Sequence, residues 1–564
     1  MRLLFTFFMS AAMLLCNEAK AQDFETASTA VKNMGVGWNL GNTLDAFNQS
    51  VTDVSSSAYW GQQGLESENY WGQPTTKPEL MAMMKNAGFS AIRVPVTWFN
   101  HMDSEGNVDA AWMARVKEVV DCVLEQGLYC IINVHHDTGA NSDEAKHWLH
   151  ASGTSYTSNK NRYENLWRQI ATQFKDYGEK LLFESYNEML DDYSSWCFAS
   201  FATSSNYNSS VATDAYNAIN NYAQSFVNVV RGTGGNNAKR NLIVNTYGAC
   251  NGGGNWNSHL QDPLKEMKKP TGESNHIIFE VHSYPNISNL SNAKNEVDEM
   301  FSSINQHLVS KGAPVIIGEW GTSNVDNGSD YNNNRANMIL FLDYFVKKAK
   351  EFNYATFYWM GLSDGSNRSL PVFNQPDLAE AIVKAYHGNT DGYVYPTRGD
   401  YETVYDVTFN NQWSELNLIN GSISTSNYTG LELELEEKPA TGAFQFKAYP
   451  STITQPIASA KSTFTFTSAM GSTINRITLQ SCKAGNSTVV KKAYLIRKDG
   501  TKEEAEISAF WGCTVSERIA SSITPIFTTN DNADQRIFNL RGQQVSTPLP
   551  GGIYIKNGKK FIMR

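Results

Sequence analysis

The chain has 564 residues, and at roughly 150 residues per domain this length predicts several domains, or one large barrel with attachments. Lysine and arginine number 46 against 56 aspartates and glutamates, and without any long basic run the net charge of −10 excludes nucleic acid and anionic membranes as expected partners. Charged residues make up only 18% of the chain and aromatic residues 12%, so much of the polar surface must consist of amides and hydroxyls. This composition suits a neutral, hydroxyl-rich ligand.

The N-terminus has the pattern of a signal peptide. Arg2 precedes a short apolar run over residues 3–15, and Ala19-Lys20-Ala21 is a small-residue cleavage site. We therefore expect a secreted or cell-surface protein cleaved after Ala21. The run is too short to span a bilayer and no other apolar stretch of about 18 residues occurs, so no membrane span is expected. Lipid attachment at Cys16 is a weaker alternative, because the preceding Leu15 is bulky.

Between residues 35 and 360, short β-type runs alternate with segments of helical periodicity, which is typical of a parallel sheet built from βα units. The expected strands are Gly35–Gly41, Ala91–Trp98, Tyr129–His136, Leu181–Glu188, Asn241–Tyr247, Ile277–Tyr284, Pro314–Gly321 and Ala355–Met360. Eight such units predict an α/β fold of the (β/α)8 TIM barrel class. An open doubly wound sheet is disfavoured, since no glycine-rich phosphate turn follows the first strand.

The helical signal ends near residue 388. We expect the barrel domain over 22–388, a linker over 389–400, a small all-β sandwich over 401–517 and a short β tail over 518–564. Only Cys482 and Cys513 lie in a β region where a disulfide is plausible, and this pairing is a guess. Cys122 and Cys130 fall in apolar patterns and are expected as buried thiols.

Two glutamates stand at the C-terminal ends of expected barrel strands, Glu188 in the fourth and Glu319 in the seventh. Because the C-terminal strand ends of such a barrel meet at one face, the two carboxylates should be neighbours there. A carboxylate pair is what glycoside hydrolysis requires: one protonates the leaving oxygen, and the other attacks the anomeric carbon or activates water. A single glutamate would more simply pair with an arginine, but two such positions favour the hydrolase.

Other polar and aromatic residues fall at or near the same strand ends, and they are Arg93, His135, His136, His282, Tyr284 and Trp359. A metal site at His135-His136-Asp137 is the alternative, since histidine and carboxylate are zinc ligands. Adjacent histidines in a strand point to opposite faces, so both reach one ion only where the strand has already become a loop. No G-x-S-x-G element supports a serine nucleophile.

Several of these segments occur in ordered motifs that resemble glycoside hydrolase family five, the family of cellulases and their relatives. The motifs are Gly37-Trp38-Asn39-Leu40-Gly41-Asn42-Thr43-Leu44-Asp45-Ala46, Trp71-Gly72-Gln73-Pro74-Thr75-Thr76, Ile92-Arg93-Val94-Pro95-Val96-Thr97-Trp98, Asn133-Val134-His135-His136, Asn187-Glu188, His282-Ser283-Tyr284 and Gly318-Glu319. They cover roughly residues 30 to 388.

The resemblance implies a retaining double displacement, with Glu188 as acid/base and Glu319 as nucleophile. It further implies that Arg93 steadies the charge of Glu319 and that Asn187 binds the sugar 2-hydroxyl. His135, His136, His282 and Tyr284 would complete the polar shell, Trp359 would stack under the sugar, and His101 would belong to the same cleft.

The chain departs at two places from the pattern of the family members that it resembles most in the first motif. Asn187-Glu188-Met189 stands where they commonly have Asn-Glu-Pro, and Trp359-Met360-Gly361 where they have a Trp-Asp pair. These differences leave the chemistry intact and put the identity of the polymer in doubt. Trp60, Trp71 and Trp256 are expected as sugar platforms where exposed and as loop anchors where buried.

The appended regions carry weaker patterns. The β module resembles carbohydrate-binding sandwiches in size and position, with Trp413, Tyr428 and Trp511 as candidate platforms, although packing is favoured for each. The tail resembles Bacteroidetes-type secretion sorting domains through Asn539-Leu540-Arg541-Gly542-Gln543 and Gly552-Ile553-Tyr554, the alternative being an ordinary terminal hairpin.

The sequence therefore predicts an exported endo-β-1,4-glycanase of the cellulase type, acting as a monomer on a β-linked polysaccharide without a cofactor or a required metal. Xyloglucanase, mannanase and xylanase activities remain open, since one fold accommodates them through its loops. The rival from another class is a surface glycan-binding protein on an inactive barrel, which loss of either glutamate would favour.

Overall fold

A computed structural model describes residues 24–142, 145–195, 207–322, 328–521, 538–539, 553–556 and 559–562. The expected signal peptide lies outside the described residues, as does most of the expected sorting tail. Within the described part, no helix combines the length and apolar character needed to cross a bilayer. The chain divides into two compact units after Arg398.

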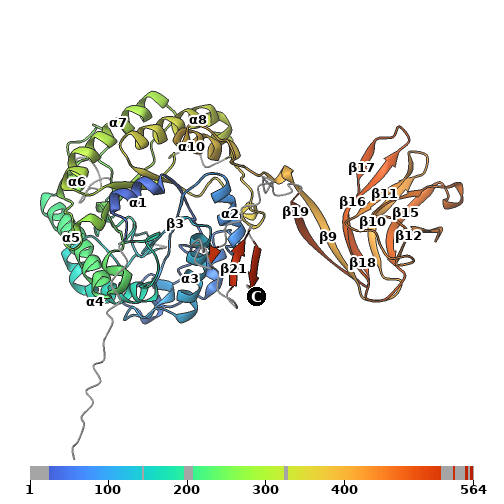
Figure 1. Ribbon diagram of the computed structural model, residues 1–564, viewed down its shortest axis with the longest axis horizontal. Coiled ribbons are helices and arrows are strands. Elements are labelled where there is room, and N and C mark those ends of the chain that lie inside the picture. Colours follow the sequence, from blue (N-terminus) through green and yellow to red (C-terminus); the bar gives the residue numbers. More distant parts are fainter. Residues whose placement is uncertain are drawn as a thin grey trace, which may run out of the picture. The chain divides into compact units, whose positions relative to one another are not determined.

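The first unit confirms the expected barrel: eight parallel strands close in sequential order inside a ring of helices (Figure 1). The strands are β1 Val36–Asn39, β2 Ala91–Val94, β3 Tyr129–Asn133, β4 Leu181–Glu184, β5 Leu242–Asn245, β6 Ile277–Ser283, β7 Val315–Trp320 and β8 Ala355–Tyr358. All eight end earlier than the sequence predicts, by one to four residues, so that residues such as His135, His136 and Glu188 belong to loops.

The helices of this unit are α1 Ala27–Met34, α2 Pro78–Asn86, α3 Ala110–Glu125, α4 Gly153–Gln173, α5 Ser209–Gly232, α6 Asp262–Glu266, α7 Leu290–His307, α8 Gly328–Glu351, α9 Ser366–Ser369 and α10 Pro376–His387. Their sequences carry local start signals. Asp109 caps α3 by accepting hydrogen bonds from the N–H groups of Ala111 and Trp112, and Pro78 opens α2. The apolar stripe of α3 then faces the barrel with Val116, Val119, Val120 and Val123 buried.

The barrel interior is layered because alternate residues of each strand point inward. The lower layer is apolar and packs against Val31 and Met34 of α1; it contains Ala91, Ile131, Leu182, Ile243, Ile278 and Ile316. The next inward layer is polar and fully buried, with Asn39 of β1 and, two residues beyond five members of the lower layer, Arg93, Asn133, Glu184, Asn245 and Glu280. A charged layer therefore lies directly beneath the C-terminal face.

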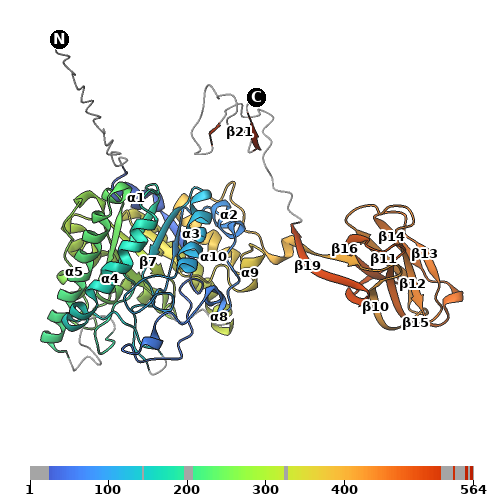
Figure 2. The same cartoon turned by 90° about the horizontal axis from the view of Figure 1, so that it is seen from below.

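The second unit is an all-β sandwich whose two sheets share one apolar core (Figure 2). The five-stranded sheet has the order β13 Thr454–Pro456, β12 Phe444–Tyr449, β15 Thr473–Ser481, β10 Glu415–Ser424 and β18 Ser508–Trp511. The other sheet has the order β14 Lys461–Thr465, β11 Tyr428–Leu435, β16 Ser487–Arg497, β9 Tyr401–Phe409 and β19 Cys513–Ser521, with β17 Lys502–Glu504 beside β16. Alternation puts Phe444, Phe446 and Ala448 of β12 inside.

Two expectations about the second half of the chain change in detail. The expected linker includes residues that pack on the barrel: the N–H of Val394 donates to Asn86 O, and the N–H of Phe373 to Pro396 O. Cys482 and Cys513 are free thiols rather than a disulfide, and Cys513 Sγ instead contacts the carbonyl oxygen of Glu415 at 3.1 Å.

In the tail, β20 Phe538–Asn539, β21 Ile553–Lys556 and β22 Lys559–Ile562 form a small antiparallel sheet.

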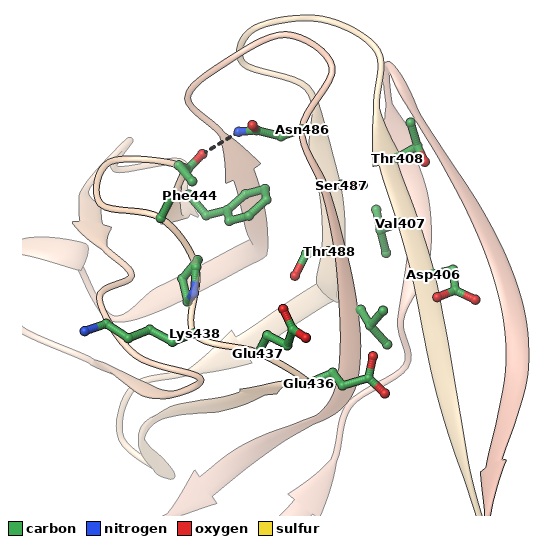
Figure 3. A pocket seen from close by; sticks show the side chains of 14 residues that line it. Asp406, Val407, Thr408, Glu436, Glu437, Lys438, Phe444, Asn486, Ser487 and Thr488 are labelled. Carbon is green, nitrogen blue, oxygen red and sulfur yellow. Dashed lines mark hydrogen bonds between the residues drawn. The ribbon is translucent and has the colours of Figure 1, made fainter. Parts of the chain in front are cut away.

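A cavity of about 500 Å³ opens in the sandwich between β9, β16 and the segment 436–440 (Figure 3). Glu436, Glu437 and Lys438 border it together with Asp406 and Thr488. Phe444 also lines this cavity, which is larger than the pocket of about 300 Å³ that Glu188 lines in the barrel.

Candidate active site

Glu188 and Glu319 meet at the C-terminal face of the barrel. Glu319 lies within β7, one residue before that strand ends, whereas Glu188 lies in the loop four residues beyond the end of β4. One carboxylate oxygen of each and one ring nitrogen of His282 lie within 4.8 Å of one another. The N–H of Asn187 donates to Val134 O at 3.0 Å, which holds the loop carrying Glu188 against the end of β3.

Glu319 is held as an anion by several donors. Arg93 Nη1 donates to its Oε1 at 2.8 Å and Tyr284 OH donates to its Oε2 at 2.8 Å. Burial alone would raise the pKa of the Glu319 carboxyl, but the charges of His282 and Arg93 and these hydrogen bonds outweigh it and lower the pKa below its usual value. Glu319 is therefore a buried, ionised carboxylate.

Arg93 is the centre of the charged layer. Its Nε and Nη2 make a two-pronged contact with Glu184 at 2.6 and 2.7 Å, and its Nη2 also donates to Asn187 Oδ1 at 2.8 Å. Glu280 Oε1 lies 3.4 Å from Arg93 Nε. One guanidinium thus serves three buried carboxylates, those of Glu184, Glu280 and Glu319, which is the fork geometry that suits arginine better than lysine.

Sequence reasoning missed Glu184 and Glu280. Both stand inside expected strands, in Leu181-Leu182-Phe183-Glu184 and Ile277-Ile278-Phe279-Glu280, and a charged residue in such an apolar run is the available signal. Since a buried charge requires a partner, the inward-facing Arg93 of β2 is the natural candidate, although β2 is a neighbour of neither β4 nor β6.

His282 connects Glu188 to the charged layer. Its Nδ1 lies 2.8 Å from Glu188 Oε1, and its Nε2 lies 3.4 Å from Glu280 Oε1. Burial lowers the pKa of His282, but Glu319, Glu188 and Glu280 together raise it to about 10. The ring is therefore an imidazolium over the neutral pH range, and each of its N–H groups points to a carboxylate.

Aromatic rings lie beside His135 and His136. Trp359 is half-buried and its ring lies parallel to that of His135, with 6° between the planes and 5.9 Å between centroids. His136 stacks edge-on against Trp71 at 5.3 Å, and Trp71 is 36% exposed. Gly41 makes room for this wall, because a β carbon there would come within 2.9 Å of the Trp359 ring.

His101 does not join this group. Its ring is 2% exposed, stacks on Trp112 at 3.6 Å and has both nitrogens in contact with protein oxygens, Nδ1 with Gln63 O and Nε2 with Ser67 Oγ, each at 3.1 Å. The expectation that His101 lies in the cleft is corrected accordingly: the residue anchors the loop that precedes α2. Trp60, only 7% exposed, is likewise an anchor and not a platform.

The histidine pair meets the geometric condition for a cation site. Because β3 ends at Asn133, both histidines lie in a loop, and Asp45, His135 and His136 each place one ligand-type atom within 4.8 Å of the others. Both oxygens of Asp45 already accept hydrogen bonds, from the N–H groups of Asn42 and Thr43. Asp137 is turned away and accepts from Trp98 N, Phe99 N and Trp148 Nε1.

Comparisons with known proteins show the family of the chain. Residues 45–364 match the family model of cellulases, glycosyl hydrolase family 5. The chain is 30% identical to Endoglucanase B of Neocallimastix patriciarum over 390 residues, which cover 66% of this chain and 73% of the relative.

Among solved structures, a GH5-4 broad specificity endoglucanase from an uncultured bacterium is 60% identical, with a TM-score of 0.61 over 65% of this chain and 98% of that chain. A family 5 enzyme of Prevotella bryantii, solved with a xyloglucan tetradecasaccharide, is 40% identical, with a TM-score of 0.55 over 65% of this chain and 99% of that chain. The chain belongs to glycosyl hydrolase family 5 and is an O-glycosyl hydrolase of the endoglucanase type.

Proposed function

We propose that the protein is an endo-β-1,4-glucanase that hydrolyses β-glucan with retention of the anomeric configuration. The observation that carries the proposal is the separation of Glu188 and Glu319, whose nearest oxygens lie within 4.8 Å. Retaining pairs stand about 5 to 5.5 Å apart, whereas inverting pairs leave about 6.5 to 9.5 Å for a water molecule. The short separation supports attack by a carboxylate instead of by water.

In the first step Glu319 attacks the anomeric carbon and Glu188 gives its proton to the departing glycosidic oxygen, which leaves a glycosyl ester on Glu319. In the second step Glu188 takes a proton from water, the hydroxide oxygen bonds to the anomeric carbon, and the ester bond to Glu319 breaks. The lowered pKa of Glu319 keeps the nucleophile ionised. The hydrogen bond to His282 holds the carboxyl of Glu188 toward the cleft.

The neighbouring residues suit these steps. Since Asn187 Oδ1 accepts from Arg93, the orientation of the amide is set and its Nδ2 is left to donate to the sugar 2-hydroxyl. Trp359 offers a half-buried ring face on the aromatic side of the cleft, where a sugar would stack. His135 is neutral, because burial and the neighbouring positive groups lower its pKa well below the usual value, so its ring adds no charge beside Glu319.

The β-glucan backbone is the proposed substrate because the similar proteins are named endoglucanases, and a xyloglucan complex among them suggests that branched glucans are also accepted. Export through the N-terminal signal peptide belongs to the same proposal, since a polysaccharide of this kind does not cross a bilayer. Mannan and xylan are the competing polymers.

The test is reducing-sugar release from β-glucan, xyloglucan, glucomannan and arabinoxylan by the wild type, Glu319→Ala, Glu188→Ala and the exposed control Glu125→Ala. We expect glucan cleavage that falls by at least about 10³-fold in both site variants and is unchanged in the control. Proton NMR of the first product should show the β anomer. An α product would contradict retention, and binding without hydrolysis by the wild type would favour the glycan-binding rival.

Azide separates the two roles. In Glu188→Ala, azide should restore turnover and yield a β-glycosyl azide, because the anion attacks an ester still formed on Glu319. In Glu319→Ala it should yield the α-glycosyl azide by direct displacement. Exchange of these two products between the variants would reverse the assignment of the glutamates.

A further inference from the structure

Glu280 is a buried carboxyl group that lies two residues before His282 on β6. Both side chains point into the barrel, because residues i and i+2 of a strand share a face. Glu280 is fully buried, and its Oε1 lies 3.4 Å from His282 Nε2. The same oxygen lies 3.4 Å from Arg93 Nε, whereas Oε2 has no hydrogen-bond partner among the described residues. One oxygen of Glu280 therefore faces both Arg93 and His282.

His282 joins two carboxyl groups through its two ring nitrogens. Nδ1 lies 2.8 Å from Glu188 Oε1, and Nε2 lies on the side of Glu280. Because both nitrogens of a protonated ring are donors, an acceptor at Nε2 restricts how the ring can turn, and hence where the N–H at Nδ1 points. Glu280, His282 and Glu188 thus form a chain of three groups that runs from the barrel interior to its C-terminal face.

The side chain of Glu188 depends on this chain of groups for its orientation. Glu188 lies in a loop, four residues beyond the end of β4, and its side chain is 22% exposed. Within the part of the chain that the structure describes, the hydrogen bond to its carboxyl group comes from His282. Glu319, by contrast, is held by both Arg93 and Tyr284. A residue that orients His282 therefore also orients the proposed acid/base.

Glu184 offers a matched comparison in the same buried layer. It is as deeply buried as Glu280 and contacts Arg93 at 2.6 and 2.7 Å. Its further hydrogen bond comes from Asn133 Nδ2 at 2.8 Å and not from His282. Both glutamates thus support Arg93, and through it the proposed nucleophile, but of the two only Glu280 contacts the histidine.

We propose that Glu280 is a positioning residue for the proposed acid/base: by accepting the hydrogen bond from Nε2 it fixes the ring of His282, and the ring holds the carboxyl group of Glu188 beside the departing oxygen. The inference rests on the proposed function, because it takes Glu188 as the group that gives the proton. It adds a residue that contacts neither the substrate nor the reacting atoms, and it assigns that residue to proton transfer instead of to nucleophilic attack.

The experiment compares a reaction that needs the proton of Glu188 with one that does not. The leaving group of cellohexaose is a sugar hydroxyl, which must be protonated, whereas 2,4-dinitrophenyl β-cellotrioside releases a phenolate. The measured quantity is kcat/KM, which reports formation of the glycosyl ester. Glu280→Gln keeps an acceptor oxygen at the place of Oε1, and Glu280→Met has a similar volume without one. Glu184→Gln is the matched control.

We expect Glu280→Met to lose about 30-fold in kcat/KM on cellohexaose, which is a part of the roughly 10²- to 10⁴-fold that a general acid supplies, and less than about threefold on the dinitrophenyl substrate. Glu280→Gln should keep most of the activity on cellohexaose. Glu184→Gln should lose equally on both substrates, because it disturbs Arg93. Equal losses on the two substrates in Glu280→Met, or a loss in Glu280→Gln as large as in Glu280→Met, would overturn the proposal.

The ring N–H protons of His282 give a second readout in the full-length protein. Because a hydrogen bond shifts the resonance of its proton downfield, the Nε2–H signal should move upfield in Glu280→Met and stay near its wild-type position in Glu280→Gln. An Nε2–H resonance that does not move in Glu280→Met would contradict the hydrogen bond to Glu280.

Failure of the proposed function would show in a different variant. Glu188→Ala should lose at least about 10³-fold on cellohexaose and little on the dinitrophenyl substrate. If it loses equally on both, Glu188 is not the acid and the proposed function fails. If Glu188→Ala shows the expected difference and Glu280→Met does not, the positioning role alone is refuted. Activity on the dinitrophenyl substrate also reports that each variant is folded, and Glu280→Ala replaces Glu280→Met if the latter does not fold.

Discussion

Gly318 stands where the carboxylate of Glu280 passes between β6 and β7: a β carbon built on Gly318 would overlap Glu280 Oε1. The register of the two strands shifts here, from Val281 opposite Ile317 to His282 opposite Glu319. The shift leaves Gly318 unpaired and brings Glu319 level with His282. Burial and Glu184 raise the pKa of Glu280 to about 8 despite Arg93 and His282, which reflects the crowding of carboxylates in this layer.

Gly318→Ala should therefore destabilise the protein by about 3 kcal/mol, because the added methyl group displaces Glu280 from Arg93 and His282. Glu280→Ala removes the obstructing carboxylate. In the double variant the alanine at 318 should cost about 1 kcal/mol or less, and urea unfolding of the four proteins measures this coupling. If the effects of the two substitutions on the unfolding free energy simply add, the contact between residue 318 and Glu280 is not the cause of the destabilisation.

The charge of His282 is directly measurable. Because Glu319, Glu188 and Glu280 raise its pKa to about 10 against burial, its ring should remain an imidazolium at pH 8. The folded pKa lies above the ordinary value of 6.5, so the stability this raised pKa contributes is complete below about pH 6.5 and is lost as the pH rises toward 10. Nitrogen-15 NMR of labelled histidine resolves the state, and a neutral ring at pH 8 would contradict the prediction. Glu188→Gln should lower the pKa of His282.

His101 should contribute to acid lability. Burial lowers its pKa from 6.5 to about 4. Between these two pH values the unfolded chain therefore binds a proton at His101 and the folded chain does not. Stability is then complete above about pH 6.5 and falls by about 1.4 kcal/mol per pH unit for this group as the pH drops toward 4. His101→Gln should flatten the dependence of the unfolding free energy on pH over that window by this amount. An unchanged slope would show that His101 titrates normally.

Trp60 and Trp71 should respond to alanine in opposite ways. Trp60 packs against Tyr59 and Trp148 under the guanidinium of Arg162, which lies 4.2 Å from its ring centroid, so Trp60→Ala should cost about 3 to 5 kcal/mol in unfolding free energy. Trp71→Ala, at a partly exposed ring, should leave thermal unfolding nearly unchanged and weaken binding of β-glucan oligosaccharides. Titration calorimetry alongside thermal unfolding separates the two, and a stability loss in Trp71→Ala would contradict its role as a platform.

The sequence predicted the barrel and the proposed catalytic pair for related reasons. The alternation of strand and helix patterns is local, and each βα unit carries its own apolar stripe and caps, so eight runs could be counted without knowing how they meet. The positions of Glu188 and Glu319 at the C-terminal ends of the fourth and seventh runs then predicted both at one face of any closed barrel. The strand boundaries were predicted less accurately. β4 ends at Glu184, so Glu188 lies in the loop that follows this strand.

Tertiary structure alone decided which polar residues serve the site. The sequence predicted that Arg93 contacts Glu319. It did not predict the contacts of Arg93 with Glu184 and Glu280, which lie on other strands. These inward-pointing side chains come together only when the barrel closes. His101 looked like a cleft residue by its motif and is instead buried beneath a loop, while Trp256 stands exposed. The local sequence determines whether a segment has the periodicity of a helix or of a strand. Whether a side chain is exposed, and which charge it pairs with, depends on the distant segments that pack against it. Closure of the barrel and packing of its long loops bring those segments into place.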